Sequence, residues 1–223
     1  MKRNQSGFTL IEIAIVLVII GLLLGGVLKG QELINSAKVK NLASDFKNVP
    51  VFIYGYQDKF KALPGDDAGV VAHVAGTLAT TNGTPGNGVI EGIWNSTTQT
   101  DESYLFWQHV RLAGLAPGPT SAADPNYLPT NAAGGTIGIQ SGTTVVANSP
   151  VKDASGNAIR GSYIICSTGI LGKFVLQLDT TMDDGNTATG SMMAVPTGSP
   201  LNTSATATGT IDPAATYTVC MGI

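Results

Sequence analysis

The sequence predicts an α+β fold in which a long N-terminal helix, transmembrane in its first half, packs against a C-terminal antiparallel β-sheet domain. Three observations predict it. Residues 8–28 form a predominantly apolar run, and a helix crosses a bilayer with about 20 such residues. Beyond Lys29, apolar residues recur every three or four positions to about Phe60, which is the period of an amphipathic helix. From Thr136 onward, short segments alternate apolar and polar residues, as half-buried strands do.

The predicted helix continues past the apolar run, with residues 29–62 as its amphipathic half. Its buried face is expected to comprise Val39, Leu42, Phe46, Val49, Ile53, Tyr56 and Phe60. Pro50 lies within this half, and a proline inside a helix removes one hydrogen bond. The sequence therefore predicts a kink or a local interruption at Pro50.

Residues 63–223 are expected to form the globular domain. Leu63-Pro64-Gly65-Asp66-Asp67 provides a turn signal, and a loop is expected from there to about Gly92. A second helix is predicted to start with the hydroxyl of Thr100 as its cap and to stop at Gly114. Strands are predicted at residues 136–147, 160–166, 191–195 and 216–221, whereas residues 171–182 fit both a strand and a helix.

The N-terminus combines a short leader with an unusual carboxylate. Residues 1–7 contain Lys2 and Arg3 and no acid, and Glu12 lies inside the apolar run that follows. An ionised side chain in hydrocarbon costs about 2.5–3.5 kcal/mol on insertion scales. Glu12 is therefore expected to have a charged or hydrogen-bonding partner, and we interpret it as a candidate functional residue.

The string Gly7-Phe8-Thr9-Leu10-Ile11-Glu12 resembles the type IV pilin-like family, which includes type IV pilins and the pseudopilins of type II secretion. The resemblance implies that a prepilin peptidase removes the leader, residues 1–7, by cutting after Gly7. The same enzyme would methylate the new N-terminal residue, Phe8. The apolar segment would then serve as membrane anchor and filament core.

Cleavage would give Glu12 a nearby cation. The new α-amine of Phe8 would be largely protonated at neutral pH, because its ordinary pKa is about 8. Residues four apart share a helix face, so the pair could form within one subunit or between staggered neighbours. The alternative is that Glu12 merely extends to the membrane interface. The leader favours the role in assembly.

Resemblance extends to a subgroup of pilin-like proteins. The segments that carry it are Leu63-Pro64-Gly65-Asp66, Trp107-Gln108-His109, Ala113-Gly114-Leu115 and Asp183-Asp184-Gly185. In that subgroup the stretch before Asp183 is helical, which favours a helix for residues 171–182.

Composition argues against a basic, nucleic-acid-binding protein. Charged residues make up 12% of the chain and the net charge is −3, whereas soluble domains average about 25% charged residues. The local exception is a group of lysines on the long helix, which we interpret as a solvated face: Lys38, Lys40, Lys47, Lys59 and Lys61. No nucleic acid is expected as a partner.

Cys166 and Cys220 are the only cysteines. In an exported chain one pair is most simply a disulfide. A catalytic thiol is the alternative, but neither cysteine has a neighbouring histidine in the sequence. Many pilins carry a similar C-terminal disulfide, so the resemblance agrees with the pairing.

An oxygen-rich cluster near the C-terminus comprises Asp179, Asp183, Asp184 and Asn186. Calcium accepts such ligands, and the resemblance adds that major pseudopilins bind calcium in a C-terminal loop. A turn that ends a helix explains the same residues, and no other cofactor is expected.

Asp66 and Asp67 are expected to form a turn, and His109 is expected to be packed in the domain interior. No HExxH, GxSxG or P-loop motif is present.

These observations predict a structural subunit that is not an enzyme. The resemblance implies insertion in the bacterial inner membrane with the C-terminal domain outside the cytoplasm, followed by polymerisation into a pilus or pseudopilus. Its partners would be further copies of the chain, the prepilin peptidase, membrane lipid, and the platform protein and ATPase of the assembly machine. The alternative is a minor pilin that acts as a binding, adhesion or DNA-uptake module at a filament tip. A membrane-anchored enzyme is a third class, without a motif to support it.

Overall fold

The computed structural model describes residues 9–223 of the chain. It divides into two compact units, Met1–Lys38 and Val39–Ile223, and the boundary falls within a helix. The first unit contributes only the beginning of that helix to the described residues. The second unit contains all remaining secondary structure.

Helix α1 spans Leu10–Phe60, 51 residues in all. In the first unit its large apolar side chains are exposed on every side, from Leu10 to Leu28. By length and composition, α1 is a helix that could cross a membrane. An all-round apolar surface of this kind is stable only against lipid or other apolar helices.

The second half of α1 buries one face within the second unit. This face includes every residue of the predicted stripe except Phe60, which is only partly buried. The buried side chains are Val39, Leu42, Ala43, Phe46, Val49, Ile53 and Tyr56. The helix is not interrupted at Pro50, so that part of the prediction is wrong. Losing one backbone bond costs about 3 kcal/mol, and burial of Val49 and Ile53 on either side offsets it.

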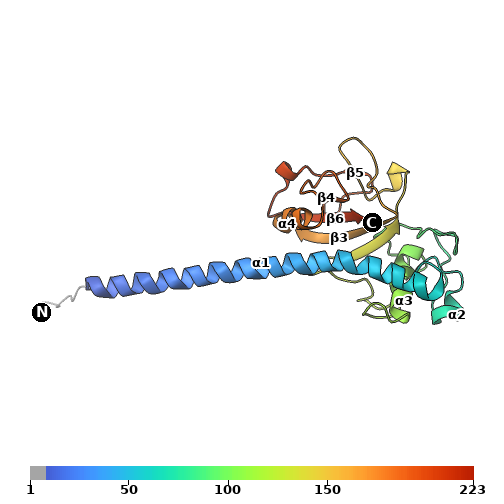
Figure 1. Ribbon diagram of the computed structural model, residues 1–223, viewed down its shortest axis with the longest axis horizontal. Helices are drawn as coiled ribbons and strands as arrows, with labels where there is room; N and C mark the ends of the chain where they lie inside the picture. The colour runs from blue at the N-terminus through green and yellow to red at the C-terminus, as the bar shows by residue number, and fades with distance from the viewer. Residues whose placement is uncertain (1–8) are drawn as a thin grey trace, which may run out of the picture. The chain divides into compact units, whose positions relative to one another are not determined.

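Four strands form an antiparallel sheet in the order β1-β3-β6-β4. Their bounds are Ile137–Ser141 for β1, Tyr163–Leu171 for β3, Met192–Pro196 for β4 and Thr216–Gly222 for β6. Figure 1 shows β6, the last strand in sequence, running alongside β3 and β4. The predicted strand at residues 136–147 is too long, because Gly142 ends β1 and a 3₁₀ turn, η1, occupies Val146–Asn148.

The sheet is covered on both faces. One face joins α1, α3 and α4 in the main core, with Ile139, Ile165 and Val219 facing inward. The other face carries a smaller core in which Val151 and Ile159 cover the sheet residues Ile164, Cys166, Met193, Val195 and Cys220. The alternation along each strand assigns neighbours such as Ile164 and Ile165 to opposite faces.

Helix α4, Gly172–Met182, follows β3 directly and packs on the sheet. The ambiguous segment is therefore helical, as the subgroup resemblance predicted. Phe174, Val175 and Leu178 are buried at the spacing of one helix face. A strand would have placed Val175 on the side opposite Phe174.

Helix α3 spans Glu102–Leu112 and is almost wholly buried. Its N-cap residue is Asp101 and not Thr100, and Asp101 makes no side-chain capping bond. The carboxylate of Asp101 instead accepts bonds from Asn82 and Ser96. The predicted hydroxyl cap is therefore wrong, whereas the stop is as expected, with Gly114 at φ +76°.

Four further small elements were not predicted. Helix α2, Val70–Val74, lies in the expected loop. Strands β2, Val151–Lys152, and β5, Thr203–Ser204, form a two-stranded parallel sheet. A second 3₁₀ turn, η2, covers Thr208–Thr210. Elements of two to five residues are too short for a periodic pattern to reveal them.

Candidate functional site

The proposed processing residues, Gly7 and Phe8, lie outside the described residues, which begin at Thr9. Glu12 is described and lies in the first turn of α1. The structure therefore shows the carboxylate of the expected assembly site and the residues that follow the cleavage position.

Thr9 and Glu12 bond to each other reciprocally. The backbone N–H and the hydroxyl of Thr9 both donate to Glu12 Oε2, each at 2.8 Å. The backbone N–H of Glu12 donates to Thr9 Oγ1 at 3.3 Å. This is a capping box, in which two otherwise unpaired helix N–H groups are satisfied by two side chains.

The capping box gives Glu12 a partner within its own chain. Both bonds from Thr9 end on Oε2, so Thr9 does not engage Oε1. Sequence reasoning missed this arrangement, although Thr9-Leu10-Ile11-Glu12 has the spacing of the motif. Thr9 thus fixes the Glu12 carboxylate at the start of α1 in the single subunit, without a contact from a second charged group among the described residues.

Four glycines of α1 lie on open surface: Gly21, Gly25, Gly26 and Gly30. A Cβ atom built on any of them would meet no atom within 4 Å. Small residues at this spacing let helix backbones approach each other closely in lipid. Within residues 9–223, no side chain fills the space beside these glycines.

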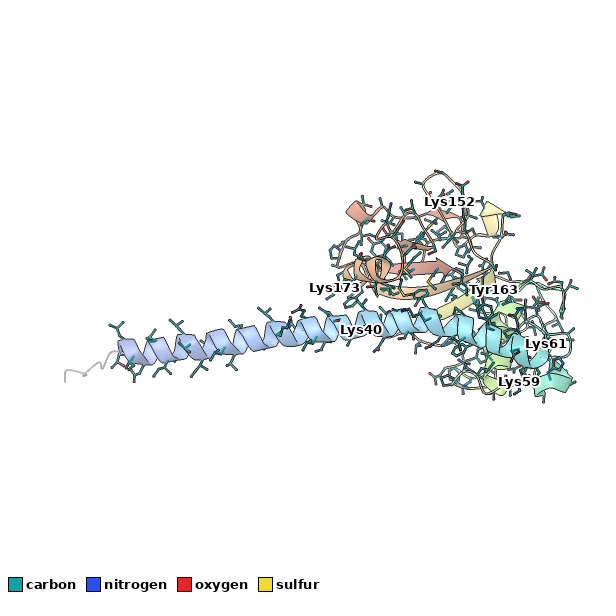
Figure 2. The ribbon with its side chains drawn as sticks, in the orientation of Figure 1. Lys40, Lys59, Lys61, Lys152, Tyr163 and Lys173 are labelled. Carbon is teal, nitrogen blue, oxygen red and sulfur yellow. A yellow bond between two sulfur atoms is a disulfide. The ribbon has the colours of Figure 1, made fainter. Side chains whose placement is uncertain are left out.

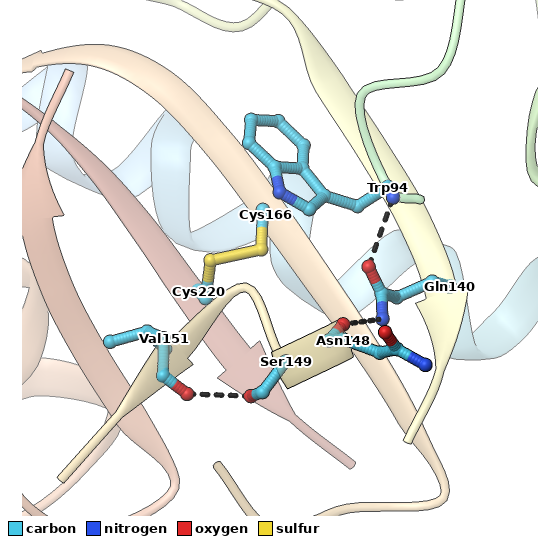
Figure 3. The surroundings of a disulfide bond; sticks show 7 residues. All are labelled: Trp94, Gln140, Asn148, Ser149, Val151, Cys166 and Cys220. Atoms are coloured by element: carbon cyan, nitrogen blue, oxygen red, sulfur yellow. Dashed lines mark hydrogen bonds between the residues drawn. A yellow bond between two sulfur atoms is a disulfide. The ribbon is translucent and has the colours of Figure 1, made fainter. Parts of the chain in front are cut away.

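The predicted disulfide is present between Cys166 and Cys220. The two residues are direct partners in the register of β3 and β6, and both are buried. Figure 3 shows Trp94 beside the bond, and Trp94 packs against the smaller core. Ser149 donates to the carbonyl of Val151 at 2.6 Å and anchors the covering segment.

The candidate calcium ligands are arranged as a turn. Asp183 accepts bonds from the Ser191 hydroxyl and the Met192 N–H, each at 2.8 Å. Asp184 accepts from the N–H of Asn186 at 2.8 Å. Within residues 9–223, no three acidic, histidine or cysteine side chains are gathered so as to hold a metal. Calcium binding here stays a prediction.

Asp179 differs from its neighbours because it is buried. Burial, then the charges of Asp184 and Asp183, raise the pKa of Asp179 to about 6, although the N–H groups of Gly185 and Asn186 act in the opposite direction. Those N–H groups are not placed for regular hydrogen bonds, and both carboxylate oxygens are buried without one. The group therefore favours its neutral form more than an exposed aspartate does.

His109 is a packed residue, as predicted. It is fully buried, the Gly65 N–H donates to Nδ1 at 2.9 Å, and Nε2 lies 2.9 Å from the Thr77 carbonyl. These bonds require the neutral tautomer with its proton on Nε2. Burial lowers the pKa of His109 and so favours the same neutral form.

Asp67 joins the end of α1 to α2. Its carboxylate accepts bonds from the Tyr56 hydroxyl at 2.7 Å and the Gly69 N–H at 2.8 Å, and it contacts His73 Nδ1 at 2.7 Å. Burial raises the pKa of Asp67, but the bonds from His73, Tyr56 and Gly69 outweigh burial and leave it below its ordinary value. Asp67 thus does more than shape a turn, because it ties three segments together.

Comparison with known protein families matches the N-terminal part of the chain. Residues 2–28 match the model of the prokaryotic N-terminal methylation motif. No curated protein and no solved structure matches the chain significantly. The chain therefore carries the N-terminal signature of the type IV pilins and pseudopilins, followed by the long apolar helix α1.

Proposed function

We propose that the chain is a structural subunit of a type IV pilus or a type II secretion-like pseudopilus, polymerised through its N-terminal helix. The observation that carries the proposal is the methylation motif at residues 2–28, whose later part forms the beginning of α1. A structural role also agrees with the absence of catalytic motifs from the sequence.

Assembly would begin at the membrane. The apolar part of α1 holds the subunit in the bilayer, which we propose to be the bacterial inner membrane, with the C-terminal domain outside the cytoplasm. Removal of the leader frees the amine of Phe8. A neighbouring subunit then offers Glu12, whose Oε1 is not engaged by Thr9. Pairing neutralises two charges that are unfavourable in lipid.

The apolar surface of α1 would then pack against other copies of itself. Its exposed leucine, isoleucine and valine side chains and its open glycines suit contacts between parallel helices. The second unit carries the disulfide, which agrees with an oxidising compartment. The peptidase, the platform protein and lipid are the partners this function requires.

A tip-located binding module is the alternative, and an exposed basic or aromatic patch would support it. Figure 2 shows Lys152 and Lys173 on separate elements, β2 and α4. Lys40 and Lys59 are exposed on α1, and Lys61 is exposed directly after its end. Lys61 pairs with Asp58 at 3.3 Å. Such dispersed cations favour the structural role over a DNA-binding one.

The mature protein is expected to begin at Phe8 and to carry one methyl group on its amine. N-terminal mass spectrometry of membrane and sheared filament fractions measures both features. A Gly7→Leu variant is the control, because it alters the cleavage position and leaves α1 intact. We expect the variant to keep its leader and to stay out of filaments. Filaments built from subunits that begin at Met1 would contradict the proposal.

A further inference from the structure

A surface segment of the second unit, residues 82–89, is folded onto buried acids. Asp66 is 2% exposed and receives three backbone N–H groups of this segment. Gly86 and Asn87 donate to Oδ1 at 2.5 and 3.2 Å, and Gly88 donates to Oδ2 at 2.7 Å. The negative charge of Asp66 therefore shapes one half of the segment.

The other half of residues 82–89 contacts two further acids. The side-chain amide of Asn82 donates to Asp101 at 3.0 Å. The backbone N–H of Thr84 donates to Glu91 at 2.7 Å. Residues 82–89 are thus held mainly by bonds to carboxylates and contribute no buried side chain of their own.

Both ends of the segment are fixed. On one side, the N–H groups of Thr80 and Thr81 donate to the Thr100 carbonyl at 3.1 and 3.3 Å. On the other side, the Ile90 N–H donates to the Ser141 hydroxyl at 2.7 Å, and the Ser141 N–H donates back to Ile90 at 3.0 Å. Movement would therefore be confined to residues 82–89.

Glu102 lies beneath this segment and is fully buried. Oε2 accepts the Glu91 N–H at 2.8 Å, whereas Oε1 is buried without a hydrogen-bond partner. Gly83 lies directly against Oε1, since a Cβ atom there would come within 2.4 Å of it. An ionised carboxylate with an unpaired buried oxygen is strongly disfavoured.

The charged groups that act on Glu102 are acids from three segments of the chain. Asp101 is the N-cap residue before α3, Asp66 lies in the turn after α1, and Glu91 lies in the loop before α3. Burial first, and then these three charges, raise the pKa of Glu102 to about 7, against a lowering effect of the Glu91 N–H. Glu102 therefore changes charge near neutral pH, unlike an exposed glutamate.

We propose that protonated Glu102 keeps residues 82–89 closed over the acids, and that loss of the proton releases this segment from the surface. Ionisation adds a fourth negative charge beside Asp66, Glu91 and Asp101 in a buried position. The ionised carboxylate must be hydrated at Oε1. Because Gly83 covers this atom, water can reach it only if Gly83 moves away.

Residues 82–89 move and α3 keeps its position, because α3 is buried and residues 82–89 are exposed. Leu105 and Phe106 of α3 are fully buried in the second unit, whereas residues 81–84 and 86–89 are exposed. Opening the segment exposes little apolar surface, whereas moving α3 would expose a core. The protein would thus present a different surface on the two sides of neutral pH.

Hydrogen exchange of the full-length protein in detergent, followed by mass spectrometry from pH 5.5 to 8.5, tests this proposal. Exchange rates are corrected for the intrinsic effect of pH. The closed form holds the Glu102 proton more tightly than the open form does. The opening equilibrium should therefore rise by up to about tenfold per pH unit between the ordinary glutamate pKa, about 4.3, and about 7, and should level off above that. Peptides covering residues 82–92 should lose protection accordingly, while those from α3 should not.

Two variants complete the design. Glu102→Gln preserves shape and stays neutral, so residues 82–92 should remain protected up to pH 8.5. Asp179→Asn removes another acid whose pKa is raised by burial and should leave the wild-type pH response of this segment unchanged. Three outcomes would overturn the proposal: protection of the wild type that does not change with pH, the same loss in Glu102→Gln, or recovery at pH 8.5 on addition of calcium, which would assign the acids to a cation.

Discussion

Replacing Glu12 by alanine is expected to leave a processed, membrane-resident subunit that forms few or no filaments. The substitution removes the acceptor for the amine of a neighbouring Phe8. Breaking one side of a buried charge pair costs about 3–5 kcal/mol. A loss of that size at each subunit addition would lower recruitment by more than a hundredfold, since 1.4 kcal/mol corresponds to a factor of ten.

Alanine also removes the capping box with Thr9, so the two roles of Glu12 must be separated. Losing a helix cap costs only about 1 kcal/mol. Glu12→Gln keeps an oxygen for the Thr9 N–H and hydroxyl but carries no charge. We expect Glu12→Gln to fail in assembly as well, because the charge and not the cap recruits the next subunit.

Glu32→Ala is a matched control for this experiment. Glu32 lies on the same helix and pairs with Lys29 at 2.7 Å, with both side chains exposed. Its loss should not change filament number. Filament number and length are counted by electron microscopy in strains expressing a single variant, and the thermal melt of each detergent-solubilised protein reports folding. Normal filaments from Glu12→Ala would reduce Glu12 to an interfacial acid without an assembly role.

Removing the disulfide is expected to lower the free energy of unfolding by about 2–5 kcal/mol. The bond closes a sequence separation of 54 residues and lies inside the smaller core. The double variant Cys166→Ala/Cys220→Ala avoids burying two hydroxyl groups. For a unit of this size, the melting temperature should fall by roughly 10 °C.

The location of the damage follows from the topology. The last strand, β6, pairs with both β3 and β4, so backbone hydrogen bonds hold it without the disulfide. We therefore expect loosening in the layer that covers the disulfide face, which includes Val151 and Ile159. Reductant should destabilise the wild type and have no further effect on the double variant. Equal melting temperatures for the two proteins would show that the bond contributes nothing.

The fold could be predicted where a long periodic pattern was compatible with only one type of secondary structure. The buried stripe from Val39 to Tyr56 was visible in the sequence because a helix repeats its face every three to four residues. The strand at 216–221 was equally visible from its alternation. Its place beside β3 was not, because strand order depends on contacts between distant segments that periodicity does not encode.

The candidate site divides in the same way. Glu12 was conspicuous because a charge in an apolar run has few explanations. Glu102 is inconspicuous in the sequence, because an acid beside the start of a helix is common and favourable. Only the structure shows that Gly83 and three acids surround it, because those contacts come from segments far apart along the chain.

The central position of β6 also determines the order in which the second unit can fold. Residues 172–215 separate the end of β3 from the start of β6, so β3 emerges during synthesis well before its central partner. Until β6 arrives, β4 lacks its neighbour in the sheet and Cys166 lacks its partner. Pairings between distant segments form slowly. The thiol of Cys166 therefore stays unpaired on an incomplete sheet until β6 is added. Formation of the disulfide is then a late step, which occurs only once the sheet is complete.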